Sequence, residues 1–220
     1  AFLLLLPALL AAEAPDLLKQ DYEKTYTETF QVDGEGEVRL ANRYGEIKVE
    51  TWDRNEVKID IRVKVSASDQ DDADRTFDRI EVNFTGGSNS ATAITNIGTR
   101  SRGSKGFIES ILDGEWPSFR RGISNSNDFK VYYRVKMPAS ASLETEAKYC
   151  DVSLPDLSGN TNISVGYGNL VAGDLTGGNE VGVCYGSARS DEMGDNGTLR
   201  VRYCDGNEIR KAAEVRFLGG

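Results

Sequence analysis

Residues 162–179 read NISVGYGNLVAGDLTGGN, and this stretch decides the predicted fold. From Ile163 to Tyr167, apolar residues alternate with small or polar ones, which is the two-residue period of a β-strand. The alternation breaks at 168–169, at 173–174 and at 177–178, where glycine, asparagine or aspartate stands. These residue types tolerate the positive φ of a sharp corner, so the stretch predicts short strands separated by three corners.

The pattern repeats every eighteen residues over the last third of the chain. Tyrosine forms one column, and a small residue follows each member: Tyr149, Tyr167, Tyr185 and Tyr203. Three mainly apolar columns keep the same register: Thr145, Ile163, Val181, Leu199 and Phe217; Ala147, Val165, Val183 and Val201; Leu157, Leu175 and Met193. A fixed short period is typical of a solenoid, so we expect a single-chain all-β solenoid of about 18 residues per coil.

Eighteen residues are also three hexapeptides, the period of left-handed helices in acyltransferases. The inward positions of one unit do not follow a strict step of six: they are 163, 165, 167, 170, 172 and 175. Those enzymes also generally rely on a histidine base, and this chain has no histidine. The hexapeptide interpretation is therefore poor.

The tyrosine column has a structural and a functional interpretation. Tyr44-Gly45 repeats the signature near the front, so the column comprises Tyr44, Tyr149, Tyr167, Tyr185 and Tyr203. Tyr167 shares the alternation phase of Ile163 and Val165, which favours an internal structural stack of rings. The alternative is an exposed ladder on which sugar rings stack.

The composition excludes much chemistry. The chain of 220 residues has no histidine, 23 glycines and a net charge of −9 from 26 basic and 35 acidic residues. Histidine-dependent nucleophiles, HExxH zinc sites and imidazole acid–base catalysis are therefore excluded. The acidic balance also argues against nucleic acid, whose phosphates need clustered Lys and Arg. We expect no enzyme, no cofactor and no metal.

Residues 1–14, AFLLLLPALLAAEA, resemble the apolar and cleavage regions of a secretory signal peptide. A membrane anchor is the alternative, but the run is shorter than the ~20 residues that a spanning helix needs. We expect an exported protein, periplasmic or on the cell surface, that contacts the membrane only through this signal. In an exported chain, three cysteines cannot all pair internally, and the spacing of Cys150, Cys184 and Cys204 predicts free thiols.

Three further segments precede or contain the repeats. Residues 15–85 predict an N-terminal β segment with one short helix at 68–79, capped by Ser68. Residues 86–128 are rich in Gly, Ser and Asn and predict a loop region with one strand at 91–97. Residues 129–220 then form the repeats.

The loop region contains the candidate recognition residues Trp116, Phe119, Arg120 and Arg121. Aromatic and arginine side chains dominate recognition hot spots, and long loops often carry function. The alternative is that Trp116 and Phe119 pack beneath the loop and tie it to the core.

The order of NRYGEIKVETWDRNEVKI (42–59), a helix, and VYYRVKMPASASLETEAKYCDVSLPDLSG (131–159) running into Tyr-Gly repeats resembles a known family. It is similar to the bacterial "putative adhesin" family of β-strand-repeat proteins, common in Bacteroidetes and catalogued as a domain of unknown function. The resemblance covers most of 22–218, although Cys150 and Cys204 stand where that family usually has glycine. It implies an exported all-β chain and supplies no catalytic residues.

Three functions follow as hypotheses. The first is a non-enzymatic cell-envelope protein, adhesin-like or scaffolding, that binds an envelope protein or a glycan through solenoid faces or the 100–121 loop. The second is a carbohydrate-active β-helix lyase or hydrolase using carboxylates, with Asp174, Asp191, Glu192 and Asp195 as candidates. Calcium-stabilised repeats are a third, but the GGxGxD pattern is absent.

The last coil has no evident cap. Gly220 follows Phe217 of the Ile163 column and stops the chain in mid-coil. An open end exposes unpaired strand groups, so we expect either a longer native chain or a covered end, through end-to-end or homo-oligomeric association.

Overall fold

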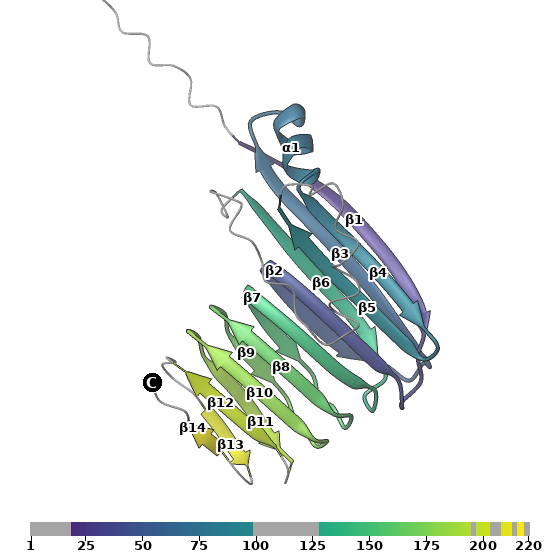
Figure 1. Cartoon of the computed structure of the whole chain (residues 1–220), viewed down its shortest axis with the longest axis vertical. Coiled ribbons are helices and arrows are strands. Elements are labelled where there is room, and N and C mark those ends of the chain that lie inside the picture. The colour runs from purple at the N-terminus through teal and green to yellow at the C-terminus, as the bar shows by residue number, and fades with distance from the viewer. Residues whose placement is uncertain (1–18, 99–127, 195–196, 203–207, 213–214, 218–220) are drawn as a thin grey trace, which may run out of the picture.

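The computed structural model describes residues 19–98, 128–194, 197–202, 208–212 and 215–217. These residues form an all-β structure with one short helix, α1 (Gln70–Phe77), as expected (Figure 1). The strands of the first part are β1 (Gln20–Gln31), β2 (Glu37–Thr51), β3 (Glu56–Ala67), β4 (Ile80–Gly87), β5 (Ser90–Ile97) and β6 (Phe129–Met137). The remaining strands are β7 (Ser142–Leu154), β8 (Thr161–Gly166), β9 (Leu170–Ala172), β10 (Asn179–Cys184), β11 (Ala188–Met193), β12 (Thr198–Arg202), β13 (Glu208–Ala212) and β14 (Val215–Phe217).

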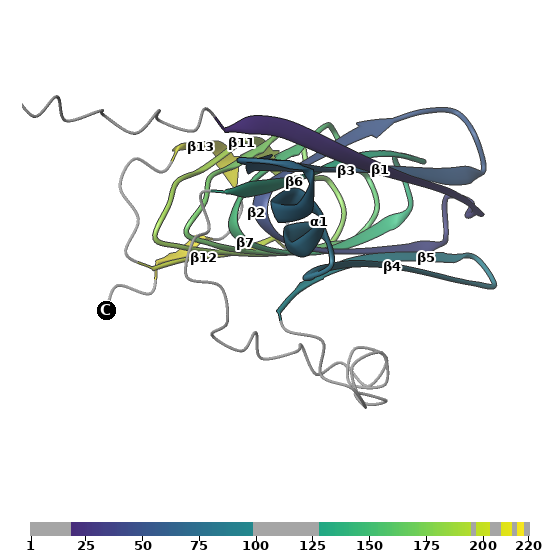
Figure 2. The same cartoon turned by 90° about the horizontal axis from the view of Figure 1, so that it is seen from above.

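The strands lie in two layers that face each other across the core, as Figure 2 shows. The first layer runs in the order β4, β5, β2, β7, β8, β10, β12, β14. The second layer runs β1, β3, β6, β2, β7, β9, β11, β13. β2 and β7 belong to both layers because each is long and bends midway, so they join the two layers at a corner.

The repeats pair in parallel, each unit lying beside the next. On the first layer Leu143 pairs with Thr161, and Thr161 with Asn179, a spacing of eighteen residues. On the second layer Val152 pairs with Leu170, and Leu170 with Ala188. A third side is marked by parallel bridges that join Leu157, Leu175 and Met193. The predicted columns are thus confirmed over these units.

The expected placement of Phe217 is wrong. Leu199 pairs with Val215, so Phe217 lies opposite Val201 and not in the column that begins at Ile163. The chain between β12 and β14 is shorter than the regular unit, and this shifts the register of the last strand by two residues.

The tyrosines turn the chain from one layer to the other. Tyr44, Tyr149, Tyr167 and Tyr185 have φ values of 63°, 53°, 58° and 55°, in the left-handed region. The sequence pattern assigns this conformation to the glycines, and that prediction is wrong for the corners that follow Tyr44, Tyr167 and Tyr185. A bulky residue in this region is strained by roughly 1–2 kcal/mol, so the corner needs a compensating interaction.

The glycine after each tyrosine is required by close backbone approach instead. A Cβ on Gly168 would lie 2.2 Å from the carbonyl oxygen of Cys150 in the preceding unit, and one on Gly186 would lie 1.8 Å from that of Gly168. A Cβ on Gly45 would lie 1.9 Å from the carbonyl oxygen of Val131. Glycine therefore lets one corner rest directly on the next.

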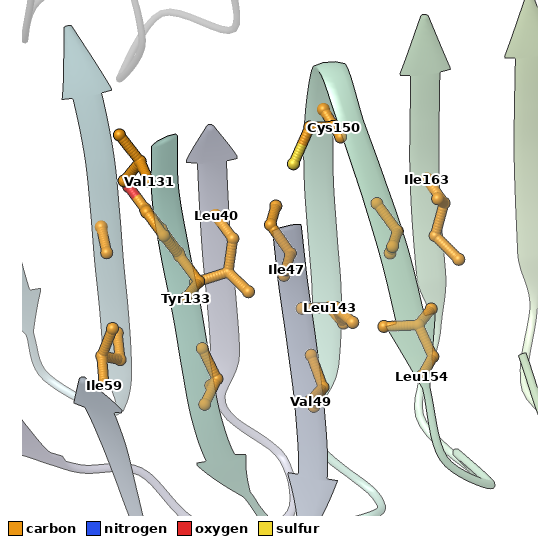
Figure 3. Packing of buried hydrophobic residues seen from close by; sticks show 14 of the residues in the cluster. Leu40, Ile47, Val49, Ile59, Val131, Tyr133, Leu143, Cys150, Leu154 and Ile163 are labelled. Atoms are coloured by element: carbon orange, nitrogen blue, oxygen red, sulfur yellow. The ribbon is translucent and has the colours of Figure 1, made fainter. Parts of the chain in front are cut away.

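The core fills the space between the layers with alternating side chains (Figure 3). Every inward residue of β3 from Val57 to Ala67 is buried, and so are Ile47, Val49, Leu143 and Ile163. Tyr133 of β6 spans the core: its hydroxyl lies 2.7 Å from Thr95 Oγ1 and donates to the Ala41 carbonyl at 3.0 Å. These contacts tie the two layers together.

The helix packs between the layers where β1, β3 and β4 lie, at the end away from β14 (Figures 1 and 2). Ala73 and Phe77 are buried, and the Lys24 ammonium of β1 lies 4.3 Å from the Phe77 ring centre. The cap is Asp69, whose side chain accepts from the Asp72 N–H at 2.8 Å, and not Ser68 as predicted. The helix begins at Gln70, so Asp69 directly precedes its first turn and can accept from an N–H group that the turn leaves unpaired.

Exposed corners are joined by polar side chains one unit apart. Asp151 Oδ1 accepts from the backbone N–H of Asn169 at 2.8 Å, and Asn169 Oδ1 accepts from the Ser187 hydroxyl at 2.7 Å. Asp156 Oδ1 accepts from the Asp174 N–H at 2.9 Å, and Asn160 Oδ1 from the Gly178 N–H at 3.0 Å. The corners therefore satisfy backbone groups that the ladders leave unpaired.

Two alanine substitutions separate close approach from strand propensity. Gly168→Ala should lower the free energy of unfolding by about 1–3 kcal/mol, because its new Cβ collides with backbone. Gly182→Ala is the matched control: its Cβ would have no neighbour closer than 3.9 Å. We expect the control to keep or slightly raise stability in urea unfolding, and equal losses in both variants would contradict this role of the corner glycine.

Substitutions of Tyr167 separate ring stacking from backbone strain. Tyr167→Phe should leave stability nearly unchanged, since it keeps the ring. Tyr167→Ala should cost about 1–3 kcal/mol, because it loses two ring pairs worth ~0.5–1.5 kcal/mol each. Tyr167→Gly should be more stable than Tyr167→Ala by roughly 1 kcal/mol, since glycine adopts positive φ freely. Thermal or urea unfolding measures the order, and an alanine variant as stable as the phenylalanine one would exclude stacking.

Candidate functional site

The tyrosine stack, formed by Tyr44, Tyr149, Tyr167 and Tyr185, is an exposed feature along the corners. Successive ring centres lie 5.1, 4.8 and 4.7 Å apart, with planes inclined by 8°, 19° and 3°. Tyr149, Tyr167 and Tyr185 are 39%, 46% and 48% exposed, so the expectation of an internal stack is wrong. The positive φ of each tyrosine turns its side chain out of the inward phase that Ile163 and Val165 keep.

The stack is nevertheless poorly suited to hold sugar rings. Tyr149 and Tyr167 each have a tyrosine ring against both faces, so only ring edges and hydroxyl groups meet solvent. At the other end, Tyr44 meets Phe129 edge-on at 5.5 Å, and the Arg43 guanidinium lies 4.9 Å from the Tyr44 ring centre. Sugar recognition by stacking needs a free ring face. The geometry of the stack therefore favours a structural role at the corners.

A shallow groove of about 550 Å³ crosses the first layer where five of its strands begin. We call it the strand-start groove. Its lining comes from β2, β7, β8, β10 and β12 and from the turns before β8 and β10: Glu37, Ser142, Leu143, Glu144, Asn160, Thr161, Asn162, Gly178, Asn179, Glu180 and Thr198. The groove follows the direction in which the strands stack, because these strands are successive neighbours in the layer.

Hydrogen bonds fix the floor and one end of the strand-start groove. Thr161 Oγ1 donates to Asn179 Oδ1 at 2.7 Å, and Asn179 Nδ2 donates to the carbonyls of Leu175 and Gly177, both at 2.7 Å. At one end Arg39 binds Glu37 at 2.9 Å and Glu144 at 3.2 Å. The groove thus presents a preorganised polar surface.

Charge in the strand-start groove is acidic. Its lining includes three carboxylates, those of Glu37, Glu144 and Glu180, and among the described residues that line it there is no lysine or arginine. Glu146 lies at the next outward position of β7, and burial raises the pKa of its carboxyl while Lys148 opposes that shift. The groove therefore suits neutral polar ligands better than anions.

The predicted recognition residues lie outside the described residues. This holds for Trp116, Phe119, Arg120 and Arg121 of the loop, for Tyr203 and for Cys204. Of the candidate acids, Asp174 lies at a corner of the repeat, whereas Asp191 and Glu192 lie in β11 of the second layer. Asp195 is outside the described residues. These acids remain a hypothesis, and Asp174 is not brought into the strand-start groove.

The strand-start groove was not predicted from the sequence. A signal for it exists, because Glu144, Asn162 and Glu180 follow one another at eighteen-residue spacing, as Ser142, Asn160 and Gly178 do. These polar columns of the repeat therefore mark the positions of the lining in the sequence. The concave shape of the groove, however, depends on the conformation of the turns before β8 and β10, which the sequence pattern does not specify.

Cys150 is a buried thiol in the place of a corner glycine. Its side chain is only 2% exposed, and Asn42 Nδ2 lies 3.4 Å from the sulfur. Burial raises the pKa of Cys150 to about 12, and the hydrogen bond from Asn42 only partly opposes this. Because the thiolate is the reactive form, burial and the raised pKa make Cys150 a poor nucleophile at neutral pH. Cys184 is also a free thiol and is half-buried.

Among the described residues, no group of three or more Cys, Asp and Glu side chains is arranged to hold a metal ion. The helix of the described part is also too short and too polar to cross a membrane.

Comparison with known proteins gives no family. No protein-family model and no curated protein match the chain. Among solved structures, it is similar to a "putative cell adhesion protein" of Clostridium sporogenes, with 9% identity, a TM-score of 0.42 and coverage of 83% of this chain and 73% of that one. A "putative adhesin" of Bacteroides fragilis has 11% identity and a TM-score of 0.32, with 89% and 95% coverage. A "putative lipid binding protein" of Parabacteroides distasonis has 11% identity, a TM-score of 0.31 and the same 89% and 95% coverage.

The thiols should differ sharply in reactivity. In a Cys184→Ser, Cys204→Ser background, Cys150 of the folded protein should resist a thiol reagent at neutral pH and react only after denaturation. In the matched Cys150→Ala, Cys204→Ser background, Cys184 should react without denaturation. Equal rates of labelling in the two folded proteins would contradict the burial of Cys150.

The same thiol should make the fold sensitive to alkali. With a pKa of 9.0 in the unfolded chain and about 12 in the folded one, the unfolded chain releases its proton first. The contribution of this thiol to stability is therefore fully present below pH 9 and is lost as the pH rises toward 12. Cys150→Ala should flatten this decline in urea unfolding. Burial raises the pKa of Tyr133 as well, so a residual decline should persist.

Proposed function

We propose that this chain is a non-enzymatic, exported protein of the bacterial cell envelope with an adhesin-like or scaffolding role. The observation that carries the proposal is the in-register stacking of polar outward positions on a rigid layer. Glu144, Asn162, Glu180 and Thr198 follow one another on adjacent paired strands. Such rows present hydrogen-bonding groups at a fixed spacing of about 4.8 Å, which suits a long partner surface.

The repeats are best described as a β-solenoid. In each regular unit, one strand joins the first layer, a second joins the second layer, and a short third side carries Leu157, Leu175 or Met193. Units that contact only their neighbours build extended binding faces, and this architecture is widely used for binding. The Tyr-Gly corners support the same description, since they recur once in each unit.

Export is supported by the sequence. The apolar run and small residues of 1–14 have the pattern of a signal peptide, and the Tyr-Gly motifs resemble an exported family. Free thiols at Cys150 and Cys184 do not oppose export, because Cys150 is buried with its pKa raised. We therefore place the protein in the periplasm or on the cell surface.

Binding without turnover is the test. Purified chain should bind saturably to cell-envelope fractions, matrix proteins or glycans displayed on arrays, and should release no product from any of them. An unfolded sample of the same chain is the control for nonspecific adhesion. Absence of binding to every preparation would overturn the proposal. Depolymerisation of a polysaccharide that disappears in Asp191→Asn would instead support the carbohydrate-active enzyme.

A further inference from the structure

We propose that the strand-start groove binds a neutral linear polysaccharide, with the sugar chain running along the stacking direction of the strands. This inference rests on the proposed function and names the class of ligand and the site. None of the described residues that line the groove is among the recognition residues predicted from the sequence.

The shape of the groove fits a linear polymer. Five successive strands contribute to its lining, and Glu37 at one end pairs with Ser142 on the next strand. Four steps between neighbouring strands extend over roughly 19 Å at the usual strand spacing. Two steps, about 10 Å, are comparable with the length of a disaccharide. A linear chain of sugars can therefore contact equivalent positions of the protein repeatedly.

The lining has the chemistry that sugar hydroxyl groups require. Most of its side chains carry amide, hydroxyl or carboxylate groups: the amides and hydroxyls both donate and accept hydrogen bonds, and the carboxylates accept them. Asn160 Oδ1 accepts from the Gly178 N–H at 3.0 Å, which fixes the orientation of its amide group. Asn162 is exposed at the centre of the groove, between Glu144 on one neighbouring strand and Glu180 on the other. Each carboxylate presents two acceptor oxygens and each amide presents an acceptor beside a donor, so a single side chain can bind two adjacent sugar hydroxyl groups.

A peptide fits the same groove less well. An extended peptide binds a sheet by hydrogen bonding to an unpaired strand edge, yet β7, β8 and β10 are each paired on both sides in this layer. Leu143 is the one apolar side chain among the described residues that line the groove, so it offers no series of pockets for apolar side chains. A peptide in this groove would therefore lack both strand-edge hydrogen bonds and apolar pockets, the two main sources of its affinity.

Charge selects among polysaccharides. Uronic-acid and sulfated chains meet like charge here, because the three carboxylates of the lining outnumber the single Arg39 guanidinium that binds Glu37 and Glu144. A neutral chain avoids this repulsion and still hydrogen-bonds to the carboxylates. Because no ring face of the tyrosine stack lines the groove, affinity must come from many hydrogen bonds and should rise with sugar-chain length.

Two pairs of variants test the site. Asn162→Ala removes the central amide, and Ser164→Ala changes another exposed residue of β8 that does not line the groove. Asn162→Trp fills the groove, and Ser164→Trp is its matched control. All four change exposed positions of one strand, so circular dichroism and thermal unfolding should show that they remain folded.

Binding is measured by calorimetry with neutral linear oligosaccharides of increasing length and different linkages, and with polygalacturonate as the anionic comparison. We expect binding of neutral chains that strengthens with length, a loss of about three- to tenfold in Asn162→Ala, and abolition in Asn162→Trp. The Ser164 variants should bind as the wild type does, and polygalacturonate should bind more weakly than neutral chains.

The outcomes distinguish this inference from the proposed function. Neutral glycans that bind equally well to Asn162→Trp and Ser164→Trp would overturn the groove as the site and leave the binding role intact. Binding of envelope proteins or polygalacturonate, with no neutral glycan bound, would overturn the ligand class alone. Absence of binding to every probe would overturn both.

Discussion

The close approach of successive backbones at the tyrosine corners is the constraint on which the rest of this structure depends. Each unit must leave one layer, enter the other and remain a strand spacing from the unit before it. Tyrosine supplies the left-handed turn, and the residue after it must let the carbonyl of the preceding corner approach. Ring stacking at 4.7–5.1 Å offsets the strain, so the corner is stable only as part of a column.

This constraint also connects the front of the chain to the repeats. Tyr44 gives β2 the same bend that Tyr149 gives β7, and the two strands pair in parallel on both sides of the bend. The antiparallel strands β1, β3 and β4 then extend the two layers beyond this junction, and α1 packs between them. Tyr133 connects the two layers across the core, because its hydroxyl forms hydrogen bonds with Thr95 and with the Ala41 carbonyl. One core therefore runs through segments that differ in sequence pattern.

The same geometry decides which surface is available for binding. Stacking occupies the faces of the central tyrosine rings, so this exposed aromatic surface is poorly suited to sugar stacking. The polar starts of the first-layer strands form a groove instead, because small residues such as Gly178 and short amides line the turns that lead into them. The residues at these positions look unremarkable in sequence, since Asn and Glu are ordinary on exposed strands. Their placement side by side comes from parallel pairing.

The sequence by itself determined the unit of eighteen residues, the strands that alternate within it and the short acidic helix. These features depend on the periodicity of side chains along the chain, which can be recognised from the order of the residues alone. It did not determine that tyrosine rather than glycine has the positive φ, that the tyrosine rings lie outside, or that Phe217 pairs with Val201. Those features arise from contacts between units, where an added Cβ either fits or collides and where the stacking of rings stabilises the fold. Only the tertiary structure contains those contacts, so only it could decide them.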